Sequence, residues 1–369
     1  LASRSTLFDQ FWVHSTQKHS VLRSISKAMD PDNWLLVTDD PIAAQIAVQC
    51  RPQLDVLEVS KAEGNDAFDW LVTQALELWI QNKYESQNLW IHSLGLAGEW
   101  DAPYEHRKVM CTSDDPDPPV DIVPPDHILG PDDDPDVLFG WSCGAGGQAI
   151  CIDQGVGLLL QTLEELGLME QSSLSIAGIS GFPLGEHRRV GLSLRNETAS
   201  SQRTTEFGNA YAERLHCPWL LKNGMGTAEP LGNRYSKPVQ TAHLLTWIQS
   251  EVPYSEFEQR YDQNDSPDSG VAISEGVHEI CVVTEHWTAR WDTEKKSDGS
   301  FQISSECLGD VFCAPEDRWQ QNEVANRVPE IESHLRRIGQ AFLDTLGNWD
   351  PSSKSEVQSA LEYIRTSER

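Results

Sequence analysis

The sequence has 369 residues, of which 39% are hydrophobic and 23% are charged, a composition typical of a soluble globular protein with one large domain or two. Its formal charge of −29, from 57 acidic against 28 basic residues, repels the phosphates of a nucleic acid, so any anionic ligand needs a local basic pocket. No apolar run reaches the roughly 18 residues that a membrane-spanning helix needs, and we therefore expect neither a nucleic-acid partner nor membrane insertion.

Strand and helix patterns alternate through the first part of the chain. Residues 33–41 (NWLLVTDDP) predict a short strand that ends at Asp-Asp-Pro, and residues 88–95 (NLWIHSLG) predict another. The stretch between them, residues 66–81, has a helical spacing of its apolar side chains, with one face made of Phe68, Leu71, Ala75, Leu78 and Trp79. This alternation predicts an α/β sandwich with a mostly parallel sheet flanked by helices.

Residues 113–137 (SDDPDPPVDIVPPDHILGPDDDPDV) interrupt this alternation. They contain seven prolines and nine aspartates. Because proline removes a backbone donor and restricts its neighbours, neither a helix nor a sheet can persist there. We expect a long surface loop.

A helical pattern resumes at Leu138 and runs through residues 146–168, with Ile150, Val156, Leu159 and Leu163 as expected core contacts. Strands are then predicted at residues 174–179 and 214–222. A further helix is predicted at residues 238–251.

The last third of the chain has a different organisation. Polar residues 258–270 indicate a boundary, residues 278–292 alternate like a hairpin, and residues 329–346 form an amphipathic helical pattern. We therefore predict an α/β domain at residues 1–257, a small C-terminal antiparallel α+β subdomain at residues 271–350, and a terminal helix or tail at residues 351–369.

Eight cysteines are scattered along the chain, and none has the Cys-x-x-Cys spacing that favours zinc or redox chemistry. We expect reduced, mostly buried thiols and a cytoplasmic location. The first residue is Leu1 rather than Met, so the sequence is compatible with a longer natural chain.

Six segments occur in an order that resembles the sulfatases of the alkaline-phosphatase superfamily, in a bacterial subgroup with a Trp-Asp-Ala-Pro loop. They are LASRSTLFDQFWVHS (1–15), LWIHSLGLAGEWDAP (89–103), GQAICIDQGVGLLLQTL (147–163), ISGFPLGEHRRVG (179–191), YAERLHCPWLL (211–221) and VFCAPEDRWQQNEVANRVPE (311–330). The resemblance implies the fold of that family, and it implies a sulfate or phosphate ester as the ligand class.

The family's chemistry requires a divalent cation, usually calcium, with oxygen ligands, together with an oxidised cysteine or serine nucleophile. The first two acidic ligands of the family would precede Leu1 in this chain, so we expect a sheet that is one strand short. Asp39 and Asp40 lie on a different strand, and we expect them to be a solvated strand end before Pro41.

The family's nucleophile motif, Cys/Ser-x-Pro-x-Arg, aligns with STQKHSVLR (15–23). Lys18 or His19 takes the position of the nucleophile, the proline is missing, and Arg23 matches the arginine. Ser20 is a nearby hydroxyl, but without the motif we do not expect it to be the nucleophile.

The family's Asp-His-Gly, which supplies a metal ligand at the end of a strand, is replaced here by Ile179, Ser180 and Gly181. Isoleucine has no lone pair for a hard cation, so we expect no metal at that position. Glu186 and His187 match the Gly-Glu-His that follows, and we expect them to stabilise a turn.

Two further positions differ from the family or lack a clear match. Asp101 stands where many members have the sulfate-binding histidine, and Arg203 is the nearest cation to the expected lysine. His243 is expected to be a half-buried core histidine. In the C-terminal unit Arg290, between Trp287 and Trp291, is expected to stack on an aromatic ring rather than to form a sugar platform.

The leading hypothesis is therefore a sulfatase-like pseudoenzyme without cofactor, in which Lys18, His19, Arg23, Asp101, Ser180, Glu186 and His187 line a vestigial cleft. A second hypothesis is an active sulfuric ester hydrolase that binds calcium. The third is an acidic interaction protein whose segment 113–137 or 258–270 binds a protein partner.

Overall fold

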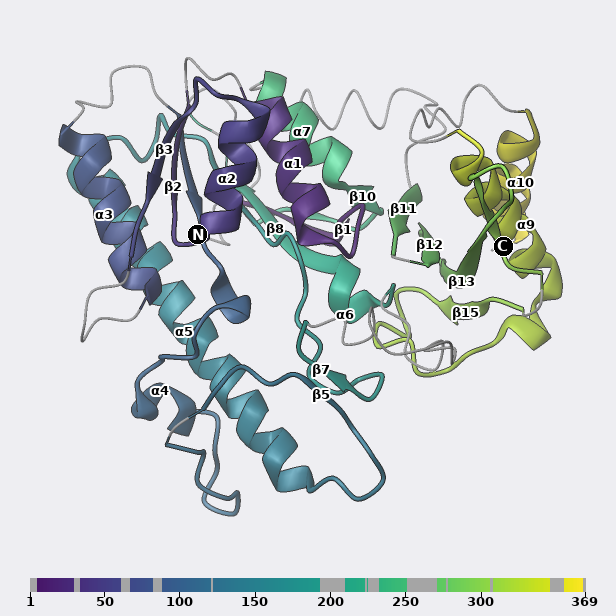
Figure 1. Cartoon of the computed structure of the whole chain (residues 1–369), viewed down its shortest axis with the longest axis horizontal. Helices are drawn as coiled ribbons and strands as arrows, with labels where there is room; N and C mark the ends of the chain where they lie inside the picture. The colour runs from purple at the N-terminus through teal and green to yellow at the C-terminus, as the bar shows by residue number, and fades with distance from the viewer. Residues whose placement is uncertain are drawn as a thin grey trace. The chain divides into compact units, whose positions relative to one another are not determined.

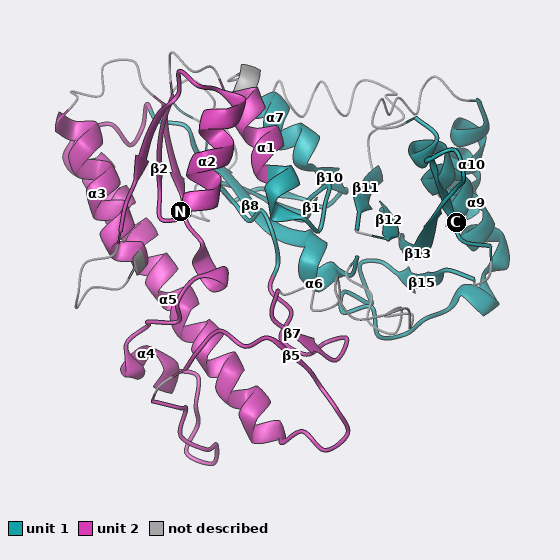
Figure 2. Cartoon of the chain, in the orientation of Figure 1, with its two compact units in different colours: residues 1–21, 172–181, 201–369 teal, residues 22–171, 182–200 magenta. Residues whose placement is uncertain are grey.

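The computed structural model describes residues 5–29, 34–60, 67–81, 88–120, 122–192, 210–222, 224, 232–250, 271–276, 278–305, 308–345 and 355–367. The chain forms two compact units, which are coloured separately in Figure 2. Unit 1 comprises residues 1–21, 172–181 and 201–369, and unit 2 comprises residues 22–171 and 182–200. Both units are discontinuous in sequence, and the expected boundary at 258–270 lies outside the described residues.

Unit 1 contains a mixed sheet with the strand order β10-β1-β8-β6 (Figure 1). The strands are β1 (Thr6–Trp12), β6 (Leu174–Ala177), β8 (His216–Lys222), β9 (Arg234–Tyr235) and β10 (Val239–Gln240). β8 is antiparallel to both β1 and β6, whereas β9 and β10 run parallel to β1. Phe8 stacks on Trp219 across β1 and β8 with a centroid distance of 3.9 Å, and this pair lies in the core.

Three helices accompany this sheet. They are α1 (Lys18–Ala28), α6 (Ala212–Leu215) and α7 (Thr241–Ser250). α1 follows β1 in the chain, and α6 immediately precedes β8. The division between the two units falls within α1.

The C-terminal part of unit 1 is an antiparallel sheet with helices, as the sequence predicts. Its strands are β11 (Val271–Glu275), β12 (Glu279–Thr284), β13 (Trp287–Lys295), β14 (Phe301–Ile303) and β15 (Asp310–Cys313). Ile280 and Val282 share one core cluster with Leu335 and Ile338 of α9 (Pro329–Leu343). The short helix η3 (Ala325–Arg327) precedes α9, and α10 (Ser355–Ser367) adds Val357, Leu361 and Ile364 to the same cluster.

Unit 2 contains a parallel sheet of three strands, β3 (Asp55–Glu58), β2 (Trp34–Thr38) and β4 (Asn88–His92), in that order. The connections between them carry α2 (Pro41–Cys50) and α3 (Ala67–Gln81). Leu35 and Val37 pack with Leu71 and Ala75 of α3, while Leu36 packs with Ala47 of α2. The alternate residues of β2 thus bury both faces of the strand, which is typical of a parallel α/β sheet.

Unit 2 also contains the long helix α5 (Pro135–Glu165) and the short α4 (Tyr104–Lys108) (Figure 1). The short helix η2 (Gly95–Ala97) follows β4. The expected core contacts of α5 are only partly correct. Leu163 is buried, but Ile150, Val156 and Leu159 are half-buried. The buried face is made mainly of small residues, namely Gly140, Cys143, Gly144, Ala145, Gly147, Gln148, Cys151, Gly155 and Leu163.

The segment 113–137 has little regular structure, as expected. Among its described residues, only His127–Ile128 form a short strand, β5, which pairs with β7 (Arg189–Val190), and α5 begins at Pro135. None of the helices that the structure describes combines the length and the apolar composition of a membrane-spanning segment.

Candidate functional site

In unit 1, the carboxyl ends of β1 and β6 lie at the same end of the sheet, because both strands run antiparallel to β8. The N–H of Val13 donates to the carbonyl of Leu215 at 2.9 Å, and the N–H of Gly181 donates to the carbonyl of Arg214 at 2.9 Å. Both acceptors lie immediately before β8. The loops that follow β1 and β6 therefore border one short stretch of backbone, which we call the β8 entry (residues 213–216).

The loop after β6 is closely packed against the β8 entry. A Cβ atom added at Gly181 would lie 2.0 Å from the carbonyl oxygen of Glu213, so only glycine fits there. The Ser180 hydroxyl donates to the carbonyl of Gly181 at 3.2 Å. Ile179 has no donor or acceptor in its side chain.

These residues do not fit a calcium ion. Calcium takes six to eight oxygen ligands, whereas the Ser180 hydroxyl is the one side-chain oxygen that Ile179, Ser180 and Gly181 offer, and it is directed at a backbone carbonyl. In the part of the chain that the structure describes, no group of three or more His, Cys, Asp or Glu side chains is placed to hold a metal ion.

The loop after β1 leads to the first turn of α1, where Lys18 is half-buried and His19 is exposed. A guanidinium nitrogen of the buried Arg214 donates to the carbonyl of Thr16 at 3.0 Å. The β8 entry thus fixes this loop through the side chain of Arg214, and it fixes the loop after β6 through the main chain of the same residue.

The structure also brings together a pair that the sequence analysis did not identify. The Ser20 hydroxyl in the first turn of α1 lies 3.5 Å from Nε2 of His14. The N–H of His14 donates to Oγ1 of Thr241 at 3.1 Å, and its carbonyl accepts from the N–H of Glu275 at 2.9 Å. Burial lowers the pKa of His14, so the ring is neutral at pH 7 and can accept a proton.

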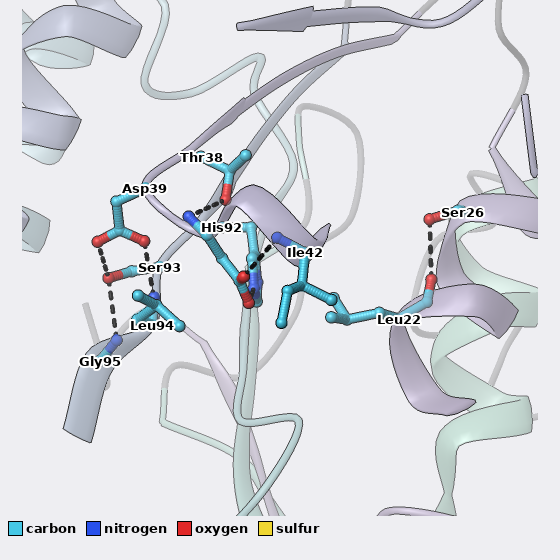
Figure 3. A network of polar contacts seen from close by, with 10 residues as sticks. Leu22, Ser26, Thr38, Asp39, Ile42, His92, Ser93, Leu94 and Gly95 are labelled. Atoms are coloured by element: carbon cyan, nitrogen blue, oxygen red, sulfur yellow. Dashed lines mark hydrogen bonds and ion pairs between the residues drawn. The ribbon is translucent and has the colours of Figure 1, made fainter. Parts of the chain in front are cut away.

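Polar side chains gather at the carboxyl ends of β2 and β4 in unit 2 (Figure 3). Asp40 is only 1% exposed, and its carboxylate accepts from the N–H of Ile42 at 2.9 Å, which caps α2. Nε2 of the buried His92 lies 3.5 Å from Oδ2 of Asp40. The expectation of a solvated strand end is therefore wrong for Asp40, because the aspartate satisfies the start of a helix.

Asp39 makes a separate connection between the same strands. Its carboxylate accepts from the Ser93 hydroxyl at 2.9 Å and from the N–H of Leu94 at 2.7 Å (Figure 3). Burial raises the pKa of Asp39, although both hydrogen bonds oppose this shift. Asp39 and Asp40 thus join the strand ends to α2 and to the loop after β4.

The other expected cleft residues of unit 2 have local partners. Asp101 is half-buried and accepts from Nε2 of Gln148 at 3.3 Å. Glu186 accepts from the N–H of Leu184 at 2.9 Å, within a turn whose Gly185 and Arg188 have φ values of +116° and +60°. His187 is half-buried in this turn, and Arg23 is exposed on α1. The turn geometry supports the structural interpretation of Glu186.

Lys18, His19, Ile179 and Ser180 belong to unit 1, whereas Arg23, Asp101, Glu186 and His187 belong to unit 2. The geometry of each set is therefore defined within its own unit. Arg203 lies outside the described residues.

Two further expectations need correction. His243 is buried, not half-buried, at 6% exposure, and its Nδ1 accepts from the N–H of Gln240 before α7. Arg290 stacks as expected on an aromatic ring, but the ring is Tyr211, at 4.6 Å, rather than either tryptophan. Trp291 is instead buried and donates to Glu332 at 2.8 Å.

No protein-family model matches the sequence, and no curated protein matches it by sequence. Solved structures do match. BT4656, in complex with its substrate D-glucosamine-2-N,6-O-disulfate, aligns with a TM-score of 0.64 and 11% identity over 96% of this chain and 93% of that one. The chain has the sulfatase fold.

Two more structures of the same fold agree with this assignment. BT1596, a 2-O GAG sulfatase, aligns with a TM-score of 0.60 and 11% identity over 96% of this chain and 87% of that one. A phosphonate monoester hydrolase from Silicibacter pomeroyi aligns with a TM-score of 0.56 and 12% identity over 95% and 90%. The fold that the six sequence segments imply is thus confirmed.

Proposed function

We propose that this chain is a sulfatase-fold protein that does not use the family's calcium-dependent ester hydrolysis and that serves instead in binding. The observation that carries the proposal is the loop after β6. Ile179 and Ser180 supply no carboxylate there, and the Gly181 backbone lies too close to Glu213 for any larger side chain. A hard cation loses an expected ligand at this position.

The ligand class that we propose is a sulfate or phosphate ester. BT4656 was solved with a disulfated glucosamine, and the phosphonate monoester hydrolase is named for a related group. A protein with a net charge of −29 needs local cations to bind such an anion. Lys18, in the first turn of α1, is the cation that we propose for this role, with the ring of the adjacent His19 as a hydrogen-bond donor, because a helix start also favours negative charge.

The proposal is tested by thermal melting of the full chain with calcium, with inorganic sulfate, and with an aryl sulfate whose turnover is followed in parallel. A ligand that binds the native state raises the melting temperature. We expect no shift with millimolar calcium, no turnover, and a shift with sulfate that is lost in Lys18→Ala. Turnover that depends on calcium would refute the proposal.

A second candidate, metal-independent ester hydrolysis, is favoured by the Ser20 and His14 pair. His14 is neutral and can take the hydroxyl proton as Ser20 Oγ attacks an ester; the bond to the alcohol breaks, and the proton passes to the leaving alcohol. A water molecule, deprotonated by the same histidine, then attacks the Ser20 ester, which releases the acid and restores the serine hydroxyl. The 3.5 Å separation is longer than a good hydrogen bond, as is common before a substrate binds.

A fluorophosphonate probe distinguishes the two candidates. The hydrolase candidate requires covalent labelling of Ser20, with loss of labelling in Ser20→Ala and a strong decrease in His14→Gln. The binding proposal predicts that wild-type protein and Ser20→Ala label equally weakly. Binding of a protein partner by segment 113–137 or 258–270 stays a prediction.

A further inference from the structure

Two cysteine side chains of unit 2 lie against each other between α4 and α5. Cys111 follows α4, Cys143 lies in the first half of α5, and their sulfur atoms are 3.7 Å apart. Sγ of Cys111 also lies 3.9 Å from the carbonyl oxygen of Arg107. None of the seven cysteines within the described residues forms a disulfide.

The glycines of α5 explain why these thiols are so close. A Cβ atom added at Gly146 would lie 2.8 Å from Cγ of Met110, and one added at Gly147 would lie 3.0 Å from Cγ of Arg107. Glycine is unfavourable inside a helix, but here it lets the chain around α4 pack directly on the backbone of α5. This close approach places Cys111 over Cys143.

We propose that Cys111 and Cys143 are a site of reversible disulfide formation, with a low-molecular-mass disulfide of the glutathione type as the oxidant. Cys111 is half-buried and can be reached from solvent, whereas Cys143 is 1% exposed. The reaction therefore begins at Cys111 and ends at Cys143.

Two exchange steps complete the reaction. The Cys111 thiolate attacks one sulfur of oxidised glutathione, a Cys111–glutathione bond forms, and one reduced glutathione leaves. The Cys143 thiolate then attacks Sγ of Cys111, the protein disulfide forms, and the second glutathione leaves. The two cysteines are oxidised by two electrons, one oxidised glutathione is reduced, and the two thiol protons pass through solvent to the two leaving thiolates.

The required movement is small. A disulfide has a sulfur–sulfur bond of about 2.0 Å, so the two atoms must approach by about 1.7 Å from their distance of 3.7 Å. Cys111 lies in a turn in which its N–H donates to the carbonyl of Lys108, whereas Cys143 lies within a helix. The side chain of Cys111 is therefore the one that moves.

The disulfide would close the proline-rich and aspartate-rich segment into a loop. Cys111 precedes residues 113–137 and Cys143 follows them. A bond between the two ends of this segment reduces the entropy of the unfolded chain, which raises the melting temperature. The site thus couples the stability of the segment to the thiol–disulfide balance around the protein.

The experiment treats the reduced full chain with oxidised glutathione and follows it by intact mass and peptide mapping. Wild-type protein should lose two hydrogens and yield a cross-linked peptide that contains Cys111 and Cys143. Its melting temperature should rise and should return to the reduced value after treatment with dithiothreitol. A stable glutathione adduct on Cys111, a bond to another cysteine, or no reaction would overturn the proposal.

Variants separate the two steps. Cys143→Ser should accumulate glutathione on Cys111, and Cys111→Ala should leave the buried Cys143 unmodified. Either variant is informative if the other fails to fold. Cys151→Ser is the matched control, because Cys151 is a buried cysteine of the same helix whose sulfur lies 3.6 Å from Nδ1 of His106. The Cys151→Ser variant should form the bond between Cys111 and Cys143 as the wild type does.

The rate gives an independent readout. Burial is the main cause that raises the pKa of Cys143, to about 11, so its thiolate is scarce near neutral pH. The closing step should therefore accelerate about tenfold per pH unit between pH 7 and pH 9, since the thiolate fraction rises by that factor. A closing rate that does not change over this range would contradict the role of Cys143.

Discussion

Nη1 of Arg107 lies 3.1 Å from the carbonyl oxygen of Pro119. The same guanidinium also donates to the carbonyls of Val120, Trp100 and Ala102, and Arg107 is 6% exposed. One buried arginine of α4 thus connects the proline-rich segment to the loop after β4. The four carbonyl groups take the place of the carboxylate that usually accompanies a buried arginine.

We expect Arg107→Met to destabilise unit 2 by about 3 kcal/mol, because it leaves the buried carbonyls of Trp100 and Ala102 without this donor. Arg107→Lys should recover only part of the loss, since an ammonium cannot reproduce the planar set of donors. Denaturant unfolding of the full chain measures both. Wild-type stability in Arg107→Met would show that the four hydrogen bonds have no net effect.

The glycines of α5 provide a matched pair of substitutions. A Cβ atom at Gly144 would lie 2.6 Å from Cδ1 of Ile122 and 2.7 Å from Cε3 of Trp100, whereas one at Gly157 would have no atom within 4 Å. Gly144→Ala should lower the unfolding free energy by about 1–3 kcal/mol through overpacking. Gly157→Ala should raise it by up to about 1 kcal/mol through helix propensity.

Thermal or denaturant unfolding of the two variants checks this prediction. Equal effects of the two substitutions would mean that the close contact between α5 and Trp100 is not present in solution.

His243 makes unit 1 sensitive to acid. Burial lowers its pKa to about 4 from an ordinary value of 6.5, so the folded protein binds its proton less readily than the unfolded chain. The contribution of neutral His243 to the free energy of unfolding is therefore complete above pH 6.5. It is lost as the pH falls toward 4, which lowers the free energy of unfolding by up to about 3 kcal/mol.

His243→Asn keeps an acceptor for the N–H of Gln240 but does not titrate. We expect a smaller decrease in unfolding free energy between pH 6.5 and pH 4 in this variant than in the wild type. Identical pH profiles would contradict the assigned protonation of His243.

Asp39 is expected to have the opposite pH dependence. Its folded pKa is raised above 3.8, chiefly by burial, so its contribution to stability is greatest below that pH and decreases as the pH rises through the folded pKa. Asp39→Asn can still accept from Leu94 and donate to Ser93, and it should be at least as stable as the wild type at pH 7. Asp39→Ala should lose about 1–3 kcal/mol because it leaves the partners unsatisfied.

Urea unfolding at pH 7 compares the two Asp39 variants. Equal losses in Asp39→Asn and Asp39→Ala would show that the charge itself is required.

The sequence predicts elements that have strong internal periodicity. The helical pattern at 329–346 corresponds to α9, the pattern at 66–81 corresponds to α3, and the hairpin at 278–292 corresponds to β12 and β13. Each of these patterns is set by the residues of the element itself, because one face is apolar and the other is polar. The order of the six family-like segments then predicts the fold.

Contacts between elements were not predictable in the same way. The apolar spacing of α5 suggests a face around Val156 and Leu159, but the helix packs through glycines whose importance depends on Trp100, Met110 and Arg107. The approach of His14 to Ser20 crosses a loop, and no local spacing fixes it. Asp40 is buried because it caps a helix, and the sequence signal for this was the Asp-Pro pair at the start of α2.

Calcium binding to the full chain, measured by isothermal titration calorimetry, tests the central claim most directly. Ile179, Ser180 and Gly181 offer one hydroxyl where the cation needs a carboxylate, so we predict no saturable heat at calcium concentrations up to the millimolar range. Saturable binding of one calcium ion that is abolished by a substitution in the loop after β6, such as Ser180→Ala, would contradict this account.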